Sequence, residues 1–342
     1  MQPTRRLFLH VSLAVCTLLP LYSVAAENNS WSFGIIADTQ WKDMEAPFYG
    51  TSIHVIDAIN AEMIRHKVDL VIQVGDLVDK PSAAGFQMRA AHNKALGKAG
   101  IRFYPVRGNH DSKGEAEVAQ FKLAFPGLPG TPEGGGSSPD LPGAAGLTYS
   151  FTHKGGKFIC LDTFPIIARE GKNGKAYTVS DYLPWIEAEL KKNDHRFAFV
   201  FAHKNLLGQS HKDNLFSSDK ENQDSNPEMQ NSFFACLQRY GVKYFFSGHD
   251  HIYNRSKIKS PDGKSEITQL ICGSAAHKFY SPKEPFLERE TPIFQEVKHV
   301  GFIIARVKDN QVNFEYYSTK PFGEEPKKPK WKLTDSFSFT TN

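Results

Sequence analysis

The chain has 342 residues, and 40% of them are hydrophobic, which is enough apolar sequence to bury a large core. This composition excludes an intrinsically disordered protein, which would combine few apolar residues with a high net charge. The formal charge is +4, and Arg5 and Arg6 supply two of these charges. The rest of the chain is nearly neutral and has no basic arm, which excludes a protein that coats nucleic acids.

The first 26 residues have the pattern of an export signal. Arg5 and Arg6 precede a long apolar run, which ends in small residues typical of a cleavage site. We therefore predict a signal peptide over residues 1–26 and a single domain over residues 27–342, located in the periplasm or outside the cell. The paired arginines resemble a twin-arginine signal, although an ordinary secretory leader explains them equally well. No later stretch is apolar enough to span a membrane, and the sequence leaves the oligomeric state open.

Short apolar segments alternate with longer amphipathic ones along most of the chain, which is typical of a sheet covered by helices. The apolar segments predict strands at residues 32–37, 69–74, 102–106, 197–202 and 243–247. The amphipathic segments predict helices at residues 46–66, 85–99, 115–125, 181–192 and 228–239. This alternation predicts an α/β fold.

Further strands are predicted where no helix intervenes, so part of the sheet system should be antiparallel. These strands are residues 147–152, 157–161, 252–257, 266–272, 301–307 and 312–317. Two segments, residues 126–146 and 204–227, are rich in loop-forming residues and longer than most loops. We expect them to shape a substrate cleft.

A polar cluster follows each of the first five predicted strands. Sheets of this kind bind ligands at the carboxyl ends of their strands, so the clusters should converge on one crevice. Convergent carboxylates, imidazoles and amides are what a pair of divalent metal ions requires. Each cluster alone is typical of a turn or a buried histidine, and the inference depends on all five together. The clusters are Asp38-Thr39-Gln40, Gly75-Asp76-Leu77-Val78-Asp79, Gly108-Asn109-His110-Asp111, His203 and Gly248-His249-Asp250-His251.

These clusters resemble the motifs of the calcineurin-like metallophosphoesterase superfamily: Asp-x-His, Gly-Asp-x-x-Asp, Gly-Asn-His-Asp or Glu, a lone His, and Gly-His-x-His. The resemblance extends from Asp38 to His251. It implies two packed mixed β-sheets flanked by helices, and two metal ions bridged by Asp76. It assigns one ion to Asp38, Gln40, Asp76 and His251. It assigns the other to Asp76, Asn109, His203 and His249, with His110 beside the centre as a non-ligand.

Two positions narrow this resemblance. Gln40 replaces the usual histidine of the first motif. The resulting Asp-x-Gln, followed by the aromatic residue Trp41, resembles the motif of manganese-dependent ADP-ribose and CDP-alcohol diphosphatases, a branch of this superfamily. The last cluster also resembles purple acid phosphatases, but Asp79 stands where those enzymes carry an iron-binding tyrosine. The resemblance therefore implies manganese as the cofactor, with iron, zinc and magnesium as alternatives.

We predict a two-metal hydrolase of small phosphate esters or phosphoanhydrides, including nucleotide-like substrates. The charge of two divalent ions exceeds that of Asp38 and Asp76, so the site would attract phosphate and lower the pKa of bound water. The resulting hydroxide would attack phosphorus. His110, oriented by Asp111, would stabilise the developing charge or protonate the leaving oxygen.

The alternative function is a non-catalytic extracytoplasmic binding protein that keeps metal ions as structural pins. The amide of Gln40, a weaker ligand than imidazole, is the feature that favours it. Four basic or imidazole side chains near the motifs are interpreted as solvated surface groups, with phosphate contact as the other possibility. They are Arg107, Lys204, His211 and His277.

Overall fold

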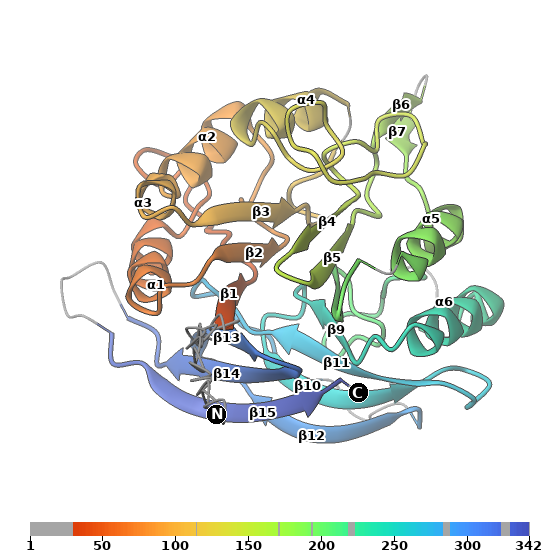
Figure 1. Cartoon of the computed structure of the whole chain (residues 1–342). Coiled ribbons are helices and arrows are strands. Elements are labelled where there is room, and N and C mark those ends of the chain that lie inside the picture. Colours follow the sequence, from red (N-terminus) through yellow and green to blue (C-terminus); the bar gives the residue numbers. More distant parts are fainter. Residues whose placement is uncertain are drawn as a thin grey trace, which may run out of the picture.

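The computed structural model describes residues 30–341 apart from residues 114, 170–171, 193, 218–222, 283–287 and 323–328. The predicted signal peptide lies outside the described residues. Two large sheets of six and seven strands lie against each other, and helices cover the outer sides (Figure 1). None of the described helices has the length and apolar character needed to cross a membrane.

The six-stranded sheet has the order β15-β14-β13-β1-β2-β3. Its parallel part consists of β1 (Ser30–Ile36), β2 (Leu70–Val74) and β3 (Arg102–Val106). Its antiparallel part consists of β13 (Val300–Lys308), β14 (Gln311–Thr319) and β15 (Lys332–Thr340). The sheet is therefore mixed, with the early strands of the chain at one edge.

The seven-stranded sheet has the order β12-β10-β11-β9-β8-β5-β4. Four neighbouring strands are parallel: β5 (Gly156–Leu161), β8 (Phe197–Ala202), β9 (Tyr244–Ser247) and β11 (Glu266–Cys272). The antiparallel strands are β4 (Tyr149–His153), β10 (Tyr253–Lys259) and β12 (Glu290–Glu296). A separate pair is formed by β6 (Ile167–Arg169) and β7 (Lys172–Lys175).

Helices lie on both outer sides of the paired sheets (Figure 1). On the side of the six-stranded sheet are α1 (Ile53–Arg65), α2 (Ala83–Ala91), α3 (Lys94–Lys98) and α4 (Glu115–Ala124). On the other side are α5 (Val179–Lys191) and α6 (Pro227–Arg239). The apolar face of α1 packs on the sheet, where Val55, Ile59 and Met63 join a buried cluster with Val71.

Aromatic side chains fill the space between the two sheets. Phe33 of the first sheet lies with its ring centroid 4.9 Å from that of Phe199 and 5.1 Å from that of Phe158, both in the second sheet. Burying one such side chain contributes roughly 1.5–3 kcal/mol. This packing fixes the ends of the two sheets relative to each other, and with them the loops that follow the strands.

The predicted α/β fold with two mixed sheets is confirmed, and each predicted strand is present with ends shifted by a few residues. The helix predicted at residues 46–66 begins only at Ile53, because Gly50 has φ +81° and Thr51 pairs with Gln40. The helix predicted at residues 85–99 is divided into α2 and α3. No strand was predicted at β6, β7, β12 or β15, of which β12 and β15 are edge strands with largely exposed side chains.

Candidate metal centre

The loops that follow the parallel strands of both sheets meet at one end of the molecule. In the first sheet, Asp38 follows β1, Asp76 follows β2 and Asn109 follows β3. In the second sheet, His203 follows β8 and His249 follows β9. The backbone N–H of His249 donates to the carboxylate of Asp38 at 3.1 Å, so the two sheets are joined directly at this point. The five predicted clusters therefore converge as expected.

Two buried carboxylates form the middle of the centre. Ligand atoms of Asp38, Asp76 and His203 lie within 4.8 Å of one another, and all three residues are buried. The Oδ1 of Asp76 is 3.4 Å from the Nε2 of His203, while its Oδ2 accepts a hydrogen bond of 2.9 Å from Gln40. The two oxygens of Asp76 thus face the two predicted ligand sets, as a bridging ligand requires.

Each of the three imidazoles has one ring nitrogen fixed by an acceptor outside the centre. The Nδ1 of His203 donates to the carbonyl of Val74 at 3.0 Å, and the Nδ1 of His251 donates to the carbonyl of Lys278 at 2.9 Å. The Nε2 of His249 is 2.9 Å from the carboxylate of Asp213. Acceptors of this kind fix the tautomer of a metal-binding histidine.

The opposite nitrogen of each ring points into the centre. The Nε2 of His203 and the Nδ1 of His249 are each 3.0 Å from the Oδ1 of Asn109. The Nε2 of His251 is 3.4 Å from the Oδ1 of Asp38. His203 and His249 therefore share Asn109, while His251 faces Asp38, in agreement with the predicted ligand sets.

Close backbone approach requires glycine in two of these loops. A Cβ added to Gly108 would lie 2.1 Å from the Oδ1 of Asp76. A Cβ added to Gly75, which has φ +87°, would lie 2.1 Å from the Nδ1 of His203. The glycines of the motifs thus leave the space that the carboxylate and the imidazole occupy.

Four of the predicted ligands have left-handed backbone conformations. The φ angles are +55° for Asp38, +49° for Asp76, +71° for His249 and +51° for His251. Such conformations cost about 1–3 kcal/mol each and concentrate at functional sites. The fold therefore holds these side chains in place at the expense of local backbone stability, which favours a functional role.

Charge at the centre is unbalanced without cations. Burial, followed by the charge of Asp76, raises the pKa of Asp38 well above its ordinary value. Burial also raises the pKa of Asp76, but His203 and His110 outweigh it and hold that pKa at about 2. Burial lowers the pKa of His203 to about 4 and that of His251 to about 3, so both rings are neutral near pH 7. Neutral imidazoles beside buried carboxylates are the state that binds divalent ions.

The amide of Gln40 also fits a metal ligand. Its Nε2 donates to Asp76, and its Oε1 is buried with no hydrogen-bond partner among the described residues. A buried polar oxygen without a partner is costly, and a cation removes that cost. The side chains present therefore fit the predicted pair of divalent ions.

His110 lies beside the centre, and its ring is held by Asp79. The Nδ1 is 2.6 Å from the carbonyl oxygen of Asp79, and the backbone N–H donates to Asp76 at 2.9 Å. The carboxylate of Asp111 instead accepts the backbone N–H groups of Leu77, Val78 and Gly108. Asp111 thus fixes the loops after β2 and β3, a role different from the predicted orientation of His110.

Two functional candidates were missed by the sequence analysis. Asp213 contacts His249 and pairs with Lys204 at 2.7 Å. Burial alone would raise the pKa of Asp213, but these two partners hold it below the ordinary value. Lys278 lies 3.5 Å from the Nε2 of His110. Both come from loops without a recognisable motif, so no local pattern indicated them.

The four side chains predicted to be solvated have protein partners instead. Arg107 is buried and forms an ion pair of 2.6 Å with Asp162, so that prediction was wrong. Lys204 is paired with Asp213, and His211 lies 2.7 Å from the carboxylate of Asp250. His277 is half-buried, with its ring centroid 5.6 Å from that of Trp41.

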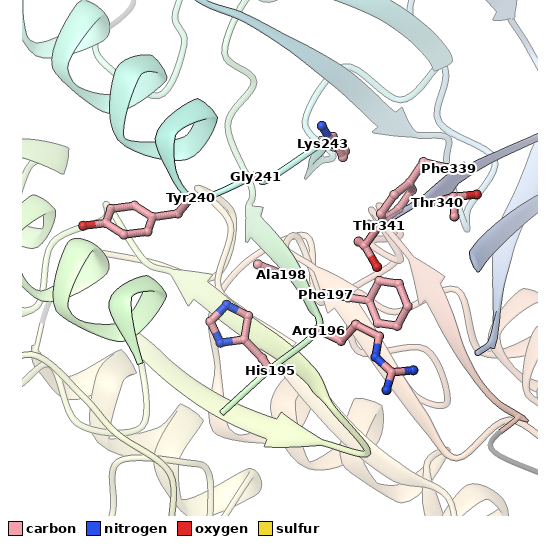
Figure 2. A pocket seen from close by; sticks show the side chains of 10 residues that line it. All are labelled: His195, Arg196, Phe197, Ala198, Tyr240, Gly241, Lys243, Phe339, Thr340 and Thr341. Carbon is pink, nitrogen blue, oxygen red and sulfur yellow. The ribbon is translucent and has the colours of Figure 1, made fainter. Parts of the chain in front are cut away.

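A pocket lies away from the centre, at the opposite ends of β8 and β9 (Figure 2). It has a volume of about 290 Å³, and its lining includes His195, Arg196, Lys243, Phe339 and Thr341. His195 and Arg196 precede β8, whereas His203 follows that strand. The pocket and the candidate metal centre therefore lie at opposite ends of the same strands.

The geometry of Asp76 leads to a first prediction. The substitution Asp76→Asn should abolish binding of both metal ions, because the shared ligand loses its charge and both ligand sets lose a carboxylate oxygen. Elemental analysis of the folded variant measures this directly. Asp79→Asn is the matched control and should retain both ions, because the carboxylate of Asp79 lies 3.7 Å from His110, which is outside both ligand sets. A full metal content in Asp76→Asn would refute the bridge.

A second prediction concerns the acceptor of His249. Asp213→Ala should weaken metal binding about 10- to 100-fold, the usual effect of removing the acceptor behind a histidine ligand. Titration of the apoprotein with manganese gives the affinity. Lys204→Met also breaks the contact with Asp213 but leaves the acceptor in place, so it should have a smaller effect. Equal losses in the two variants would assign the effect to the ion pair instead.

Comparison with known proteins places the chain by family and by fold. The family model for calcineurin-like phosphoesterase matches residues 32–253. No curated protein sequence matches the chain.

Solved structures with the same fold include PhoD, with a TM-score of 0.61 and 12% identity over 92% of this chain and 70% of PhoD. A dimetal phosphatase from Danio rerio has a TM-score of 0.54 and 15% identity over 91% of this chain and 99% of its own. A purple acid phosphatase from yellow lupin seeds has a TM-score of 0.57 and 15% identity over 91% of this chain and 54% of its own. Because the family model spans most of the chain and all five clusters, the protein belongs to the calcineurin-like phosphoesterase family.

Proposed function

We propose that the protein hydrolyses phosphate esters or phosphoanhydrides of small molecules at a centre of two divalent metal ions. One observation carries this proposal. Two buried carboxylates face three imidazoles, and each imidazole is held by an acceptor on its far nitrogen. The dimetal phosphatase and the purple acid phosphatase with the same fold support it by analogy.

The contacts support the ligand sets that the family resemblance implies. Asp38, Gln40, Asp76 and His251 would hold one ion, and Asp76, Asn109, His203 and His249 would hold the other. When bound, the two ions activate water and offset the charge of the phosphate. His110 would approach the substrate from outside both sets. Its ring is oriented by Asp79 and would stabilise the developing charge or protonate the leaving oxygen.

A screen of the purified mature chain tests this function. Chromogenic phosphomonoesters and diesters, together with nucleotide anhydrides, are each assayed with manganese, zinc, iron and magnesium. Hydrolysis that depends on added metal supports the proposal. Metal binding without hydrolysis of any substrate would favour the binding protein, whose supporting feature remains the weak amide ligand Gln40.

We also propose that the protein is exported, because residues 1–26 have the composition of a signal peptide. Fractionation of cells that express the full chain, with N-terminal sequencing of the product, tests this proposal. An uncleaved protein in the cytoplasmic fraction would contradict it.

A third prediction separates catalysis from metal binding. His110→Ala should retain both metal ions and lower turnover by a factor of roughly 10² to 10⁴, the usual contribution of a positioned acid or base. Steady-state kinetics and elemental analysis of the same preparation provide the two measurements. Metal loss would make His110 a ligand, and unchanged turnover would leave it without a chemical role.

A fourth prediction concerns the identity of the metal ions. An amide oxygen is a harder and poorer donor than an imidazole nitrogen, and oxygen-rich sites favour manganese or magnesium over zinc. The ion held by Gln40 should therefore exchange more readily and favour manganese. Gln40→His should retain this ion more tightly and shift its preference toward zinc.

Competition between manganese and zinc, measured on the wild type and on Gln40→His, tests the fourth prediction. Asn109→His is a useful comparison, because it makes the same kind of amide-to-imidazole change in the other ligand set. Identical selectivity in the wild type and Gln40→His would remove Gln40 from the metal shell.

A further inference from the structure

A sixth loop reaches the candidate metal centre. It follows β11, which is parallel to β9 and therefore ends at the same edge of the sheet as the strand before His249. The backbone N–H of Ala275 in this loop donates to the carbonyl of Ala37 at 2.8 Å, directly before Asp38. The loop after β11 thus lies against the loop that carries the first metal ligand.

Contacts on two sides fix the position of Lys278 in this loop. Its carbonyl accepts a hydrogen bond from the hydroxyl of Ser274 at 3.0 Å and from the Nδ1 of His251 at 2.9 Å. On the other side, the preceding ring of His277 packs against Trp41 and His54, with centroids 5.6 and 5.2 Å away. The backbone that carries Lys278 is therefore anchored to the metal centre and to an aromatic cluster.

The ammonium group of Lys278 lies beside the catalytic candidate. Its Nζ is 3.5 Å from the Nε2 of His110 and 5.6 Å from the ring centroid of Tyr280. The backbone carbonyl of Lys278 holds His251, which places the residue near the first ligand set. No carboxylate pairs with Lys278 in the described part of the chain, whereas Lys204 has a partner in Asp213.

We propose that Lys278 binds a non-bridging oxygen of the phosphoryl group in the substrate. This inference rests on the proposed function, because it assumes that phosphate occupies the metal centre. An ammonium group has three N–H donors, and the contact with His110 uses one of them. The others are available to an anion, and a charge-assisted hydrogen bond to a phosphoryl oxygen is strong. Together with His110, Lys278 would then bind the substrate beside the metal ions.

Orthophosphate binding to the metal-loaded protein tests this role. Lys278→Met keeps the length of the side chain and the backbone carbonyl that holds His251, but it removes the charge. We expect an unchanged metal content and an orthophosphate affinity about 10- to 100-fold lower by calorimetry, the loss expected for one hydrogen bond to a charged group. The KM for a phosphate ester should rise in the same variant. Lys278→Arg should retain most of the affinity.

The matched control is Lys243→Met, which removes a lysine from the pocket at the opposite end of the sheet (Figure 2). It should bind orthophosphate as the wild type does. Thermal unfolding verifies that each variant is folded, and Lys278→Gln replaces Lys278→Met if the latter is not. An orthophosphate affinity within twofold of the wild type in the uncharged Lys278 variant overturns the inference, as does a loss that merely follows metal loss. Orthophosphate binding that depends on Lys278, without hydrolysis of any substrate, would contradict only the proposed function.

Discussion

The burial of Asp38 and Asp76 beside each other is the constraint on which the rest of the centre depends. Removing a carboxylate from water costs several kcal/mol, and a second carboxylate nearby adds repulsion. Backbone N–H groups of His249 and His110 donate to these carboxylates but carry no net charge. The neighbouring imidazoles are uncharged at neutral pH when their pKa is low, as for His203 and His251. Lys278 adds one positive charge near Asp38, and divalent cations would supply the rest of the balancing charge.

Hydrogen bonds and an ion pair around the centre fix the loops that carry the two carboxylates. Asp111 gathers N–H groups from two loops, which holds the loop of Asp76 against the loop of Asn109. The buried ion pair of Arg107 and Asp162 connects the end of β3 with the end of β5, and so joins the two sheets. Breaking such a pair leaves a charge buried alone, which is strongly destabilising. The residues that surround the ligands thus serve mainly to keep strained loops in one conformation.

The sequence predicted the polar clusters at the strand ends but not the residues that support them, and the reason is physical. Strands and the polar residues after them are local patterns, so the position of Asp38 or His203 at a strand end follows from a few neighbouring residues. The partner of a side chain is not local. Asp162 is 55 positions from Arg107, so the sequence offered no reason to expect a buried ion pair in place of a solvated arginine. Lys278 and Asp213 come from loops whose paths only the tertiary structure defines.

Exposure, rather than hydrogen bonding, distinguishes His110 from the imidazoles of the proposed ligand sets, His203, His249 and His251. His110 has an acceptor on one ring nitrogen, as the other three do, so a fixed tautomer alone does not identify a ligand. The three imidazoles of the proposed ligand sets are nearly inaccessible, at 0% for His203, 6% for His249 and 1% for His251, whereas His110 is 29% exposed. A ring that reaches solvent beside the carboxylates is able to contact a substrate, and its Nε2 faces Lys278. The accessibility of His110 therefore suits it to act on the substrate.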